Sequence, residues 1–333
     1  MDAPKEKKFE DPFGRTINYL RLSVTDRCNL RCKYCMPEKA QFTSRDKILT
    51  LDEIYSIATV FTQLGVDTIR LTGGEPLIRK NILWLVQSLA RLEGLAELTL
   101  TTNAMNLSQF ADKLKSAGLT RINISLDSLN SKRFKEITRV GELMAVKQGI
   151  DAAIQAGFHR IRLNSVILRN YNDDEVVNLT SFAINKGIDI AFIEEMPLGK
   201  IDTHQRQNTQ VCSEEIREKL SYKFDLKPSL YKTSGPSNYF TIANTKTNVG
   251  FISPISNNFC STCNRIRVTA SGRLLLCLGN EHSVDLRAII REAPQDRERL
   301  KQIIVEALKH KPDRHYFNVN KTDIVRFMNT TGG

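Results

Sequence analysis

The stretch "LRLSVTDRCNLRCKYCMP" (residues 20–37) joins a β-rich run to a loop with three closely spaced cysteines, Cys28, Cys32 and Cys35. A structural zinc site normally takes four ligands, and no fourth soft donor lies nearby in the sequence. Three thiolates can instead hold three irons of a [4Fe–4S] cube. The fourth iron then keeps an open position, which suits a chelating ligand with an amine and a carboxylate. The loop therefore predicts a metal cluster that binds a second molecule.

Short β-rich runs alternate with segments of helical length over the first 200 residues. The expected strands are 17–24, 67–71, 97–101, 121–126, 160–167 and 189–194. The expected helices are about 81–93, 107–117, 142–156 and 173–186, and Thr50 with Glu53 forms a candidate capping box for one more helix after the cysteine loop. This alternation indicates βαβ units and a parallel sheet. Six units are fewer than the eight of a closed barrel, so we expect an α/β fold with a partial (βα)6 TIM-like barrel.

Polar clusters follow these strands. They are "TGGEP" 72–76, "TTN" 101–103, "SLDS" 125–128, "LNS" 163–165 and "EEMP" 194–197. In barrel enzymes the active site lies at the carboxyl ends of the strands. Because the cysteine loop follows the first strand, we expect it at the same rim as the polar clusters.

From about residue 200 the alternation fades, which predicts a barrel over 1–200 and a smaller α+β region over 201–333. A helix is expected over 213–222, a hairpin over 240–253 and a helix-rich segment over 284–310. This region carries a second set of three cysteines, spaced C-x2-C-x13-C. They are Cys260, Cys263 and Cys277.

The second set of cysteines admits two readings by spacing alone. One is a second iron–sulfur cluster, and the other is a zinc site completed by His282, five residues after Cys277. Arg265 and Arg267 follow Cys263, and in a strand over 264–269 they share one face. Two guanidinium groups beside an open metal position suit an anionic molecule, since the planar fork of arginine matches phosphate.

Composition and charge suit a globular enzyme of small anionic substrates. Lys and Arg exceed Asp and Glu by 48 − 37 = 11, and the excess is spread along the chain without a long basic run. We therefore expect a polyphosphate partner and no nucleic acid. No apolar stretch approaches the length of a membrane span, and the N-terminal segment lacks the apolar core of a signal peptide. The expected location is the cytoplasm, where cysteines more often bind metal than form disulfides.

The first cysteine loop, with Tyr34 before its third cysteine, is the motif of the radical S-adenosylmethionine superfamily, and "TGGEP" resembles that superfamily's GGE motif. The resemblance implies that the methionine part of S-adenosylmethionine chelates the open iron and that Glu75 accepts a hydrogen bond from its ammonium group. An electron from the cluster then cleaves the sulfonium, and a 5′-deoxyadenosyl radical abstracts a hydrogen atom from the substrate.

Within that superfamily, the chain resembles the GTP 3′,8-cyclase family of molybdenum cofactor biosynthesis. The resemblance rests on residues 20–37, "IRLTGGEPLIR" 69–79, "NISLDSL" 123–129, "RLNSV" 162–166, "FIEEMPLG" 192–199, "CSTCNRIRVTASGRLLLCL" 260–278 and the terminal Gly-Gly. It implies that the 3′ hydrogen of GTP is removed and that (8S)-3′,8-cyclo-7,8-dihydroguanosine 5′-triphosphate is formed. A separate cyclic pyranopterin monophosphate synthase would use this product, and an electron donor of open identity would supply the enzyme.

The same resemblance implies two [4Fe–4S] clusters, one on each set of cysteines, and places the guanine of GTP at the second. The implied contacts of S-adenosylmethionine are Tyr34, Gly74, Glu75, Ser125 and Met196. The implied contacts of GTP are Arg21, Arg70, Thr101, Arg162, Arg265 and Arg267. Gly332 and Gly333 are implied to enter the active site and, with Arg265 and Arg267, to be needed for turnover.

The chain departs from the family pattern at Ala104, where glycine is frequent, at Arg162, where lysine is common, and at Thr331, where an aliphatic residue is usual. None of these changes removes a cluster ligand. Two other functions remain as alternatives: a peptide-modifying radical enzyme with an auxiliary cluster, and a zinc-stabilised nucleic-acid-binding protein. We expect a monomer or a homodimer.

Overall fold

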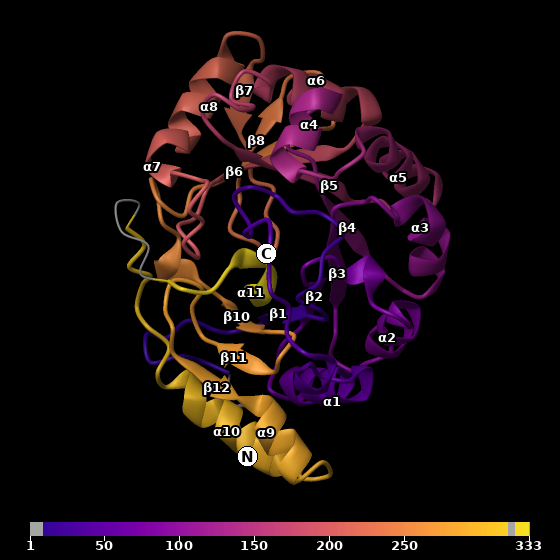
Figure 1. Cartoon of the computed structure of the whole chain (residues 1–333), viewed down its shortest axis with the longest axis vertical. Coiled ribbons are helices and arrows are strands. Elements are labelled where there is room, and N and C mark those ends of the chain that lie inside the picture. Colours follow the sequence, from indigo (N-terminus) through magenta and orange to yellow (C-terminus); the bar gives the residue numbers. More distant parts are fainter. Residues whose placement is uncertain (1–8, 319–323, 333) are drawn as a thin grey trace, which may run out of the picture.

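A computed structural model describes residues 9–318 and 324–332 of the chain. Six parallel strands follow one another in sequence and in space, and they form the predicted partial barrel (Figure 1). The strands are β1 (Tyr19–Ser23), β2 (Thr68–Thr72), β3 (Glu97–Thr102), β4 (Arg121–Ser125), β5 (Ile161–Ile167) and β6 (Asp189–Glu194). Their residues alternate between a helix-covered outer face and an inner face, which is why both faces of the apolar strands are buried.

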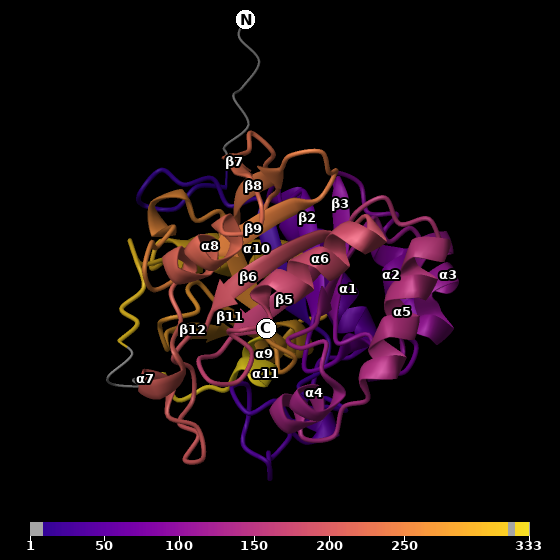
Figure 2. The same cartoon turned by 90° about the horizontal axis from the view of Figure 1, so that it is seen from above.

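Helices cover the outside of the curved sheet, as Figures 1 and 2 show from two directions. They are α1 (Leu51–Gln63), α2 (Ile82–Leu89), α3 (Leu107–Ser116), α4 (Ser131–Thr138), α5 (Leu143–Gln155) and α6 (Val176–Lys186). The predicted capping box at α1 is confirmed, because Thr50 Oγ1 accepts from the Glu53 amide at 3.1 Å and Glu53 Oε2 accepts from the Thr50 amide at 2.7 Å. Ile54, Ile57 and Phe61 then fall on one buried face of the helix.

The C-terminal region continues the barrel sheet at both of its edges. Strand β10 (Arg265–Val268) pairs parallel to β1, and β9 (Asn248–Ile252) pairs parallel to β6. The predicted hairpin is confirmed as β8 (Asn238–Ile242) and β9, and β7 (Leu226–Pro228), β11 (Arg273–Leu275) and β12 (Ser283–Asp285) complete a twelve-stranded sheet. The region is therefore joined to the barrel by strand pairing at two edges.

The remaining helices lie after the barrel. They are α7 (Arg206–Thr209), α8 (Ser213–Ser221), α9 (Leu286–Glu292), α10 (Arg297–Leu308) and α11 (Met328–Thr331). Helix α11 lies in the middle of the open face of the barrel (Figure 1). No helix in the described part of the chain is long and apolar enough to cross a lipid bilayer.

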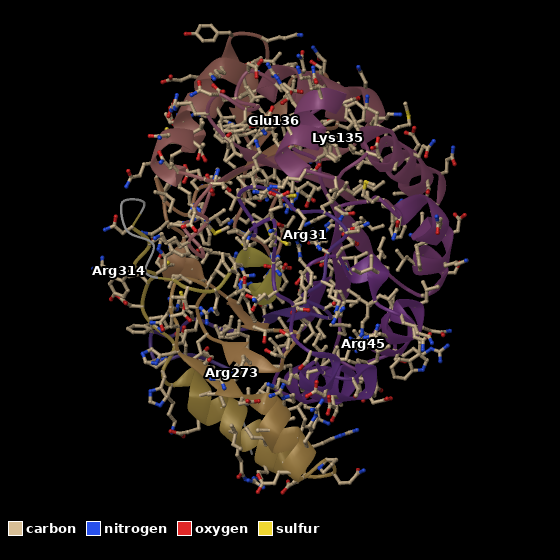
Figure 3. All side chains as sticks on the ribbon, in the orientation of Figure 1. Arg31, Arg45, Lys135, Glu136, Arg273 and Arg314 are labelled. Carbon is tan, nitrogen blue, oxygen red and sulfur yellow. The ribbon has the colours of Figure 1, made fainter. Side chains whose placement is uncertain are left out.

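Charged side chains are distributed over the face of the molecule seen in Figure 3, where Arg31, Arg45, Arg273 and Arg314 are labelled well apart from one another. Many of these charges have partners, such as Arg273 with Asp285 at 3.5 Å and Arg133 with Asp174 at 2.6 Å. Surface pairs of this kind add little to stability but divide the positive charge into small areas.

Candidate active site

A cavity of about 270 Å³ opens at the carboxyl ends of the barrel strands, and all six cysteines of the two sets line it. The first set reaches it from the loop after β1, and the second from the segment around β10 and β11. The two sets are more than 200 residues apart in the sequence, yet the pairing of β10 with β1 brings them to one cavity. The rim position predicted for the first loop is confirmed.

The first set of cysteines is partly buried. Burial raises the pKa of Cys28 to about 11 and that of Cys35 to about 12, and it holds the pKa of Cys32 well above the ordinary value. The amide of Leu30 donates to Cys28 Sγ at 3.3 Å, and Asn103 Nδ2 lies 3.7 Å from the same sulfur. Thiols of this kind stay protonated unless a metal takes the place of the proton.

The second set of cysteines has a cationic setting. Burial raises the pKa of Cys263, but the positive charges of Lys311 and Arg265 outweigh it, so the pKa of Cys263 lies below its ordinary value. Burial raises the pKa of Cys260 and of Cys277. The amide of His315 also donates to Cys260 Sγ at 3.4 Å.

The arrangement of these thiols fits clusters better than single ions. Among the residues that the structure describes, no three side chains of His, Cys, Asp or Glu converge as ligands of one metal ion. In a [4Fe–4S] cube each thiolate binds a different iron, so the sulfurs need not converge on one point. His282, the fourth ligand that a zinc site would need, is exposed and does not line the cavity. The fourth zinc ligand that the sequence suggested is therefore not at this cavity.

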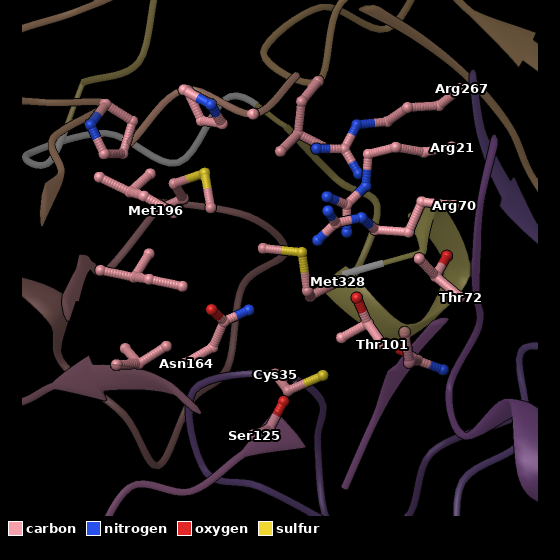
Figure 4. Close-up of a pocket in the computed structure, with 18 of the residues that line it drawn as sticks. Arg21, Cys35, Arg70, Thr72, Thr101, Ser125, Asn164, Met196, Arg267 and Met328 are labelled. Carbon is pink, nitrogen blue, oxygen red and sulfur yellow. The ribbon is translucent and has the colours of Figure 1, made fainter. Parts of the chain in front are cut away.

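Three arginines stand side by side on one wall of the cavity. In the register of the sheet, Arg21 of β1 lies opposite Arg267 of β10 on one side and Arg70 of β2 on the other. Figure 4 shows their side chains extending together into the cavity. Burial, with repulsion from Arg267, lowers the pKa of Arg21 to about 9, and burial lowers that of Arg70 to about 9 and that of Arg267 to about 10. Like charges at paired positions are destabilising, so this wall suits a polyanion.

Arg162 joins the cluster from the far side of the barrel. Its guanidinium group donates to Tyr239 Oη at 2.5 Å and to Ser237 Oγ at 3.2 Å, and its Nε donates to Asn164 Oδ1 at 3.0 Å. Asn123 is fully buried between Arg70 and Arg162. When the oxygen of its side-chain amide faces the two guanidinium groups, it accepts a hydrogen bond from each of them. Asp127 is the only carboxylate among the described residues that line the cavity, and it accepts a hydrogen bond from the hydroxyl of Tyr34.

Most of the residues predicted to contact S-adenosylmethionine also line the cavity. They are Tyr34, Gly74, Ser125 and Met196. Thr101 of the predicted GTP contacts also lines the cavity, and Figure 4 shows it beside Arg70. Tyr34 Oη donates to Asp127 Oδ2 at 2.8 Å, and burial raises the pKa of Asp127 to about 6.

Glu75 differs from the other predicted contacts because it does not line the cavity. Its carboxylate accepts from Thr102 Oγ1 at 2.7 Å, from the Asn103 amide at 2.7 Å and from the Leu77 amide at 3.0 Å. These bonds tie the turn after β2 to the end of β3. The contact of Glu75 with the cofactor ammonium stays a prediction, while its bonds to these two loops are present in the structure.

The C-terminal segment enters the cavity between the two sets of cysteines. The Asn329 amide donates toward Cys35, Asn329 Nδ2 donates to the Asp26 carbonyl at 3.0 Å, and Arg267 donates to the Gly332 carbonyl at 2.7 Å. Gly332 has φ of 75°, and a Cβ at this position would collide with Thr72. Gly333, the other glycine predicted to act here, lies outside the described residues.

Comparison with known proteins identifies the chain. The Radical SAM superfamily model matches residues 22–183, and the Molybdenum Cofactor Synthesis C model matches residues 188–317. The GTP 3′,8-cyclase of Ectopseudomonas mendocina is 52% identical over 97% of this chain and 98% of its own length. That of Pseudomonas putida strain W619 is 53% identical over 97% of both chains. The chain belongs to the GTP 3′,8-cyclase family.

Enzymes of the GTP 3′,8-cyclase family use S-adenosylmethionine and two [4Fe–4S] clusters, which agrees with the two cysteine sets. Among solved structures, SuiB of Streptococcus suis, crystallised with S-adenosylmethionine, has a TM-score of 0.60 at 15% identity, covering 94% of this chain and 77% of SuiB. This likeness confirms the radical S-adenosylmethionine fold, and the family membership comes from the relatives at about 50% identity.

The family resemblance did not predict the residues that contact the predicted site residues and fix their positions. Asn123 and Tyr239 orient Arg162, and Lys311 contacts Cys263, but none of the three was predicted. A signal existed for Asn123, because it is a lone amide in the apolar run "RINIS". Lys311 and Tyr239 gave no such signal, since each sits in a polar segment where a charged or aromatic residue is ordinary.

Proposed function

We propose that this chain is a GTP 3′,8-cyclase that converts GTP to (8S)-3′,8-cyclo-7,8-dihydroguanosine 5′-triphosphate, with the site residues in the roles given below. Cys28, Cys32 and Cys35 would hold the first cluster, which binds S-adenosylmethionine. When bound, the first cluster and S-adenosylmethionine supply the 5′-deoxyadenosyl radical that takes the 3′ hydrogen of GTP. Cys260, Cys263 and Cys277 would hold the second cluster, beside the guanine.

The observation that carries this proposal is the row of Arg267, Arg21 and Arg70 across three paired strands. The chain has no phosphate-binding loop of the G-x-x-x-x-G-K-[ST] type, so a triphosphate needs side-chain cations. Arg70 is buried and Arg21 and Arg267 are partly buried, and guanidinium groups bind phosphate oxygens with fork geometry. Arg162 adds a fourth cation, and Arg265 a fifth near the second cysteine set.

The role proposed for the residues around S-adenosylmethionine is to bind and orient it. Gly74 and Ser125 offer a backbone and a hydroxyl at the rim, Met196 offers an apolar contact, and Tyr34 is fixed by Asp127. Together with the first cysteine loop, which also lines the cavity, these residues would help to keep water from the radical.

The tail is proposed to complete the GTP site. The carbonyl of Gly332 accepts a hydrogen bond from Arg267 at 2.7 Å. A residue with a Cβ would not fit at position 332, because the Cβ would collide with Thr72. We expect Gly333→Ala to keep both clusters and to lose cyclisation. Normal product formation by that variant would contradict this role.

The partners of the proposed reaction are GTP, an electron donor of open identity, and a cyclic pyranopterin monophosphate synthase that takes the product. The proposal also includes a cytoplasmic location, no nucleic acid or membrane partner, and a monomer or homodimer. Sedimentation of the anaerobically purified enzyme would measure the oligomeric state.

The test uses protein purified and reconstituted without oxygen. We expect about eight irons per chain, as two [4Fe–4S] clusters require, and no stoichiometric zinc. With GTP deuterated at the ribose 3′ carbon, we expect one deuterium in 5′-deoxyadenosine, read by mass spectrometry. Deuterium at another ribose position serves as the matched control and should stay in the product. Zinc without iron, or radical formation independent of GTP but dependent on a peptide, would overturn the proposal.

A further inference from the structure

We propose that Lys311 is a positioning residue of the second cluster. Its ammonium group balances the negative charge of the cluster and raises the reduction potential of the cluster through a hydrogen bond to Cys263. The inference rests on the proposed second cluster at Cys260, Cys263 and Cys277. This function of Lys311 could not be inferred from the spacing of the cysteines or from the row of arginines.

Lys311 is buried, with 3% of its surface exposed. Its Nζ lies 3.7 Å from Cys263 Sγ, 3.0 Å from the Arg265 carbonyl oxygen and 2.6 Å from the Leu276 carbonyl oxygen. An ammonium group has three N–H bonds to donate, and these three acceptors account for all of them. The side chain therefore has one defined position, set by contacts on three sides.

Two of these contacts join the two segments that carry the cysteines. Arg265 lies two residues after Cys263 at the start of β10, and Leu276 directly precedes Cys277. By donating to both carbonyls, Lys311 links the segments across the space between Cys263 and Cys277. The third donor is then directed at a sulfur ligand, which identifies the lysine as part of the cluster's surroundings.

The charge of Lys311 has no carboxylate partner among the described residues. No ion pair of Lys311 with Asp or Glu occurs in that part of the chain, and its acceptors are two neutral carbonyls and a thiol. A buried ammonium without a counter-charge is costly. Three cysteinates carry more negative charge than the cluster core carries positive charge, so the cluster would supply the missing counter-charge.

A cation that donates to a ligand sulfur changes the redox chemistry of a cluster in a known direction. It withdraws electron density from the thiolate and favours the more negative, reduced state. Burial strengthens the effect because the local dielectric is low. We therefore expect Lys311 to raise the reduction potential of the second cluster, with little effect on the first.

Arg15, near the start of the chain, provides a matched control because it contacts the segment that follows Lys311. It is also buried, and it donates to the carbonyls of Cys260 at 2.8 Å, Pro312 at 2.6 Å and Asp313 at 2.7 Å. Unlike Lys311, it is paired with a carboxylate, that of Asp11 at 2.6 Å, and has no sulfur contact in the structure. A variant of Arg15 thus disturbs the packing around the second set of cysteines without removing a hydrogen-bond donor to a ligand sulfur.

The test compares Lys311→Met, Lys311→Arg and Arg15→Met as full-length, anaerobically reconstituted enzymes. Iron content and EPR-monitored redox titration report the second cluster, and the response of the first cluster to S-adenosylmethionine is the internal reference. We expect Lys311→Met to lower the potential of the second cluster, or to lose that cluster and about half of the iron. Lys311→Arg should restore the wild-type behaviour in large part. Arg15→Met should lower the potential by less than Lys311→Met, because the charge of Arg15 is paired with Asp11.

Each outcome separates this inference from the proposed function. Iron retained in Lys311→Met with an unchanged potential would overturn the inference, as would equal iron loss in Lys311→Met and Arg15→Met. Both results would leave the cyclase proposal intact. A wild-type enzyme with only about four irons would instead overturn the second cluster itself, and the proposed function with it.

Discussion

Asn123 shows how a single buried amide can set the balance between stability and binding. Its oxygen accepts from Arg70 and Arg162, which otherwise face each other as like charges. In the free enzyme a carboxylate at this position would be more favourable, because it would pair with both cations. An amide leaves their positive charge available to a triphosphate.

We therefore expect Asn123→Asp to stabilise the protein and to weaken GTP binding. Each charged hydrogen bond taken from the phosphates is worth about 1.5–3 kcal/mol, so the dissociation constant for GTP should rise by at least roughly tenfold. Thermal unfolding and equilibrium binding of GTP measure the two effects. S-adenosylmethionine binding is the control and should not change. A parallel loss of stability and GTP affinity would contradict this balance.

Glu75 makes the stability of the folded protein depend on pH. Burial raises its pKa to about 7, against an ordinary value near 4.3. As the pH rises between these values, the unfolded chain releases the proton and the folded chain retains it. The stability linked to Glu75 is therefore complete below about pH 4 and is lost as the pH rises through about 7.

For Glu75→Gln, which cannot ionise, this loss should disappear. The free energy of unfolding of the wild type, minus that of the variant, should fall by on the order of 2–3 kcal/mol between pH 5 and pH 8. Chemical denaturation of both proteins over this range would measure the difference. A difference independent of pH would show that the donors from Thr102, Asn103 and Leu77 keep the carboxylate ionised throughout.

At the residue scale, the sequence could indicate positions whose chemistry is tied to spacing, and the roles of these residues stay predictions. The six cysteines and the arginines of the wall could be predicted because their motifs specify them, and all of them line one cavity. Asn123, Tyr239 and Lys311 could not, since their importance depends on neighbours that are distant in the sequence. Ala104 stands where the family frequently has glycine, and it takes φ of 60°, a left-handed conformation that glycine adopts more readily.

At the scale of elements, the placement of α11 depends on one turn after β6. Leu198 forms a bridge with Ile324, and the Gly199 amide donates to the Ile324 carbonyl at 2.8 Å. Gly199 has φ of 62°, and a Cβ there would collide with the ring of Phe327, one residue before α11. Buried Arg206 fixes the turn by donating to the Leu198 and Gly199 carbonyls, and it pairs with Glu195 at 3.0 Å.

We expect Gly199→Ala to displace Phe327 and the tail. Cyclisation of GTP should fall at least tenfold, while cluster content and S-adenosylmethionine binding remain. Gly187→Ala is the matched control, because Gly187 has a similar φ of 66° but nothing within 4 Å of an added Cβ. Both variants should lose about 1 kcal/mol through backbone strain, measured by denaturation. Equal activity in the two would rule out the contact with Phe327 as an anchor of the tail.

Elements were predictable where periodicity is strong. The six barrel strands and the hairpin were identified because buried strands read as continuous apolar runs. Helix α4 and the short strands β7, β11 and β12 were missed, since they have at most eight residues and few apolar positions. The sequence of helix α11 shows no helical pattern of apolar residues, and the helix forms where it packs into the cavity.

At the scale of the whole molecule, the sheet does not stop at residue 200. The barrel strands and the C-terminal strands share one core, in which Phe192 of β6 and Phe251 of β9 pack with ring centroids 6.2 Å apart. Pairing of β10 with β1 could not be predicted, because parallel pairing between strands 240 residues apart leaves no local signal. That pairing is nevertheless what brings the second cysteine set and its arginines to the first.

The division at residue 200 stays a prediction, and expression of the two parts would test it. Alone, residues 1–200 would expose the edge of β1 that pairs with Arg265–Val268 and the edge of β6 that pairs with Val249–Ile252. Unpaired edges of apolar strands associate with one another, so we expect this fragment to aggregate. Co-expression with residues 201–333 should recover a soluble one-to-one complex that binds iron, because strand pairing restores both edges and the shared core. A soluble, monomeric 1–200 fragment with a cooperative unfolding transition would show instead that the barrel is an independent domain, and that the C-terminal strands add the substrate site without being needed for the fold.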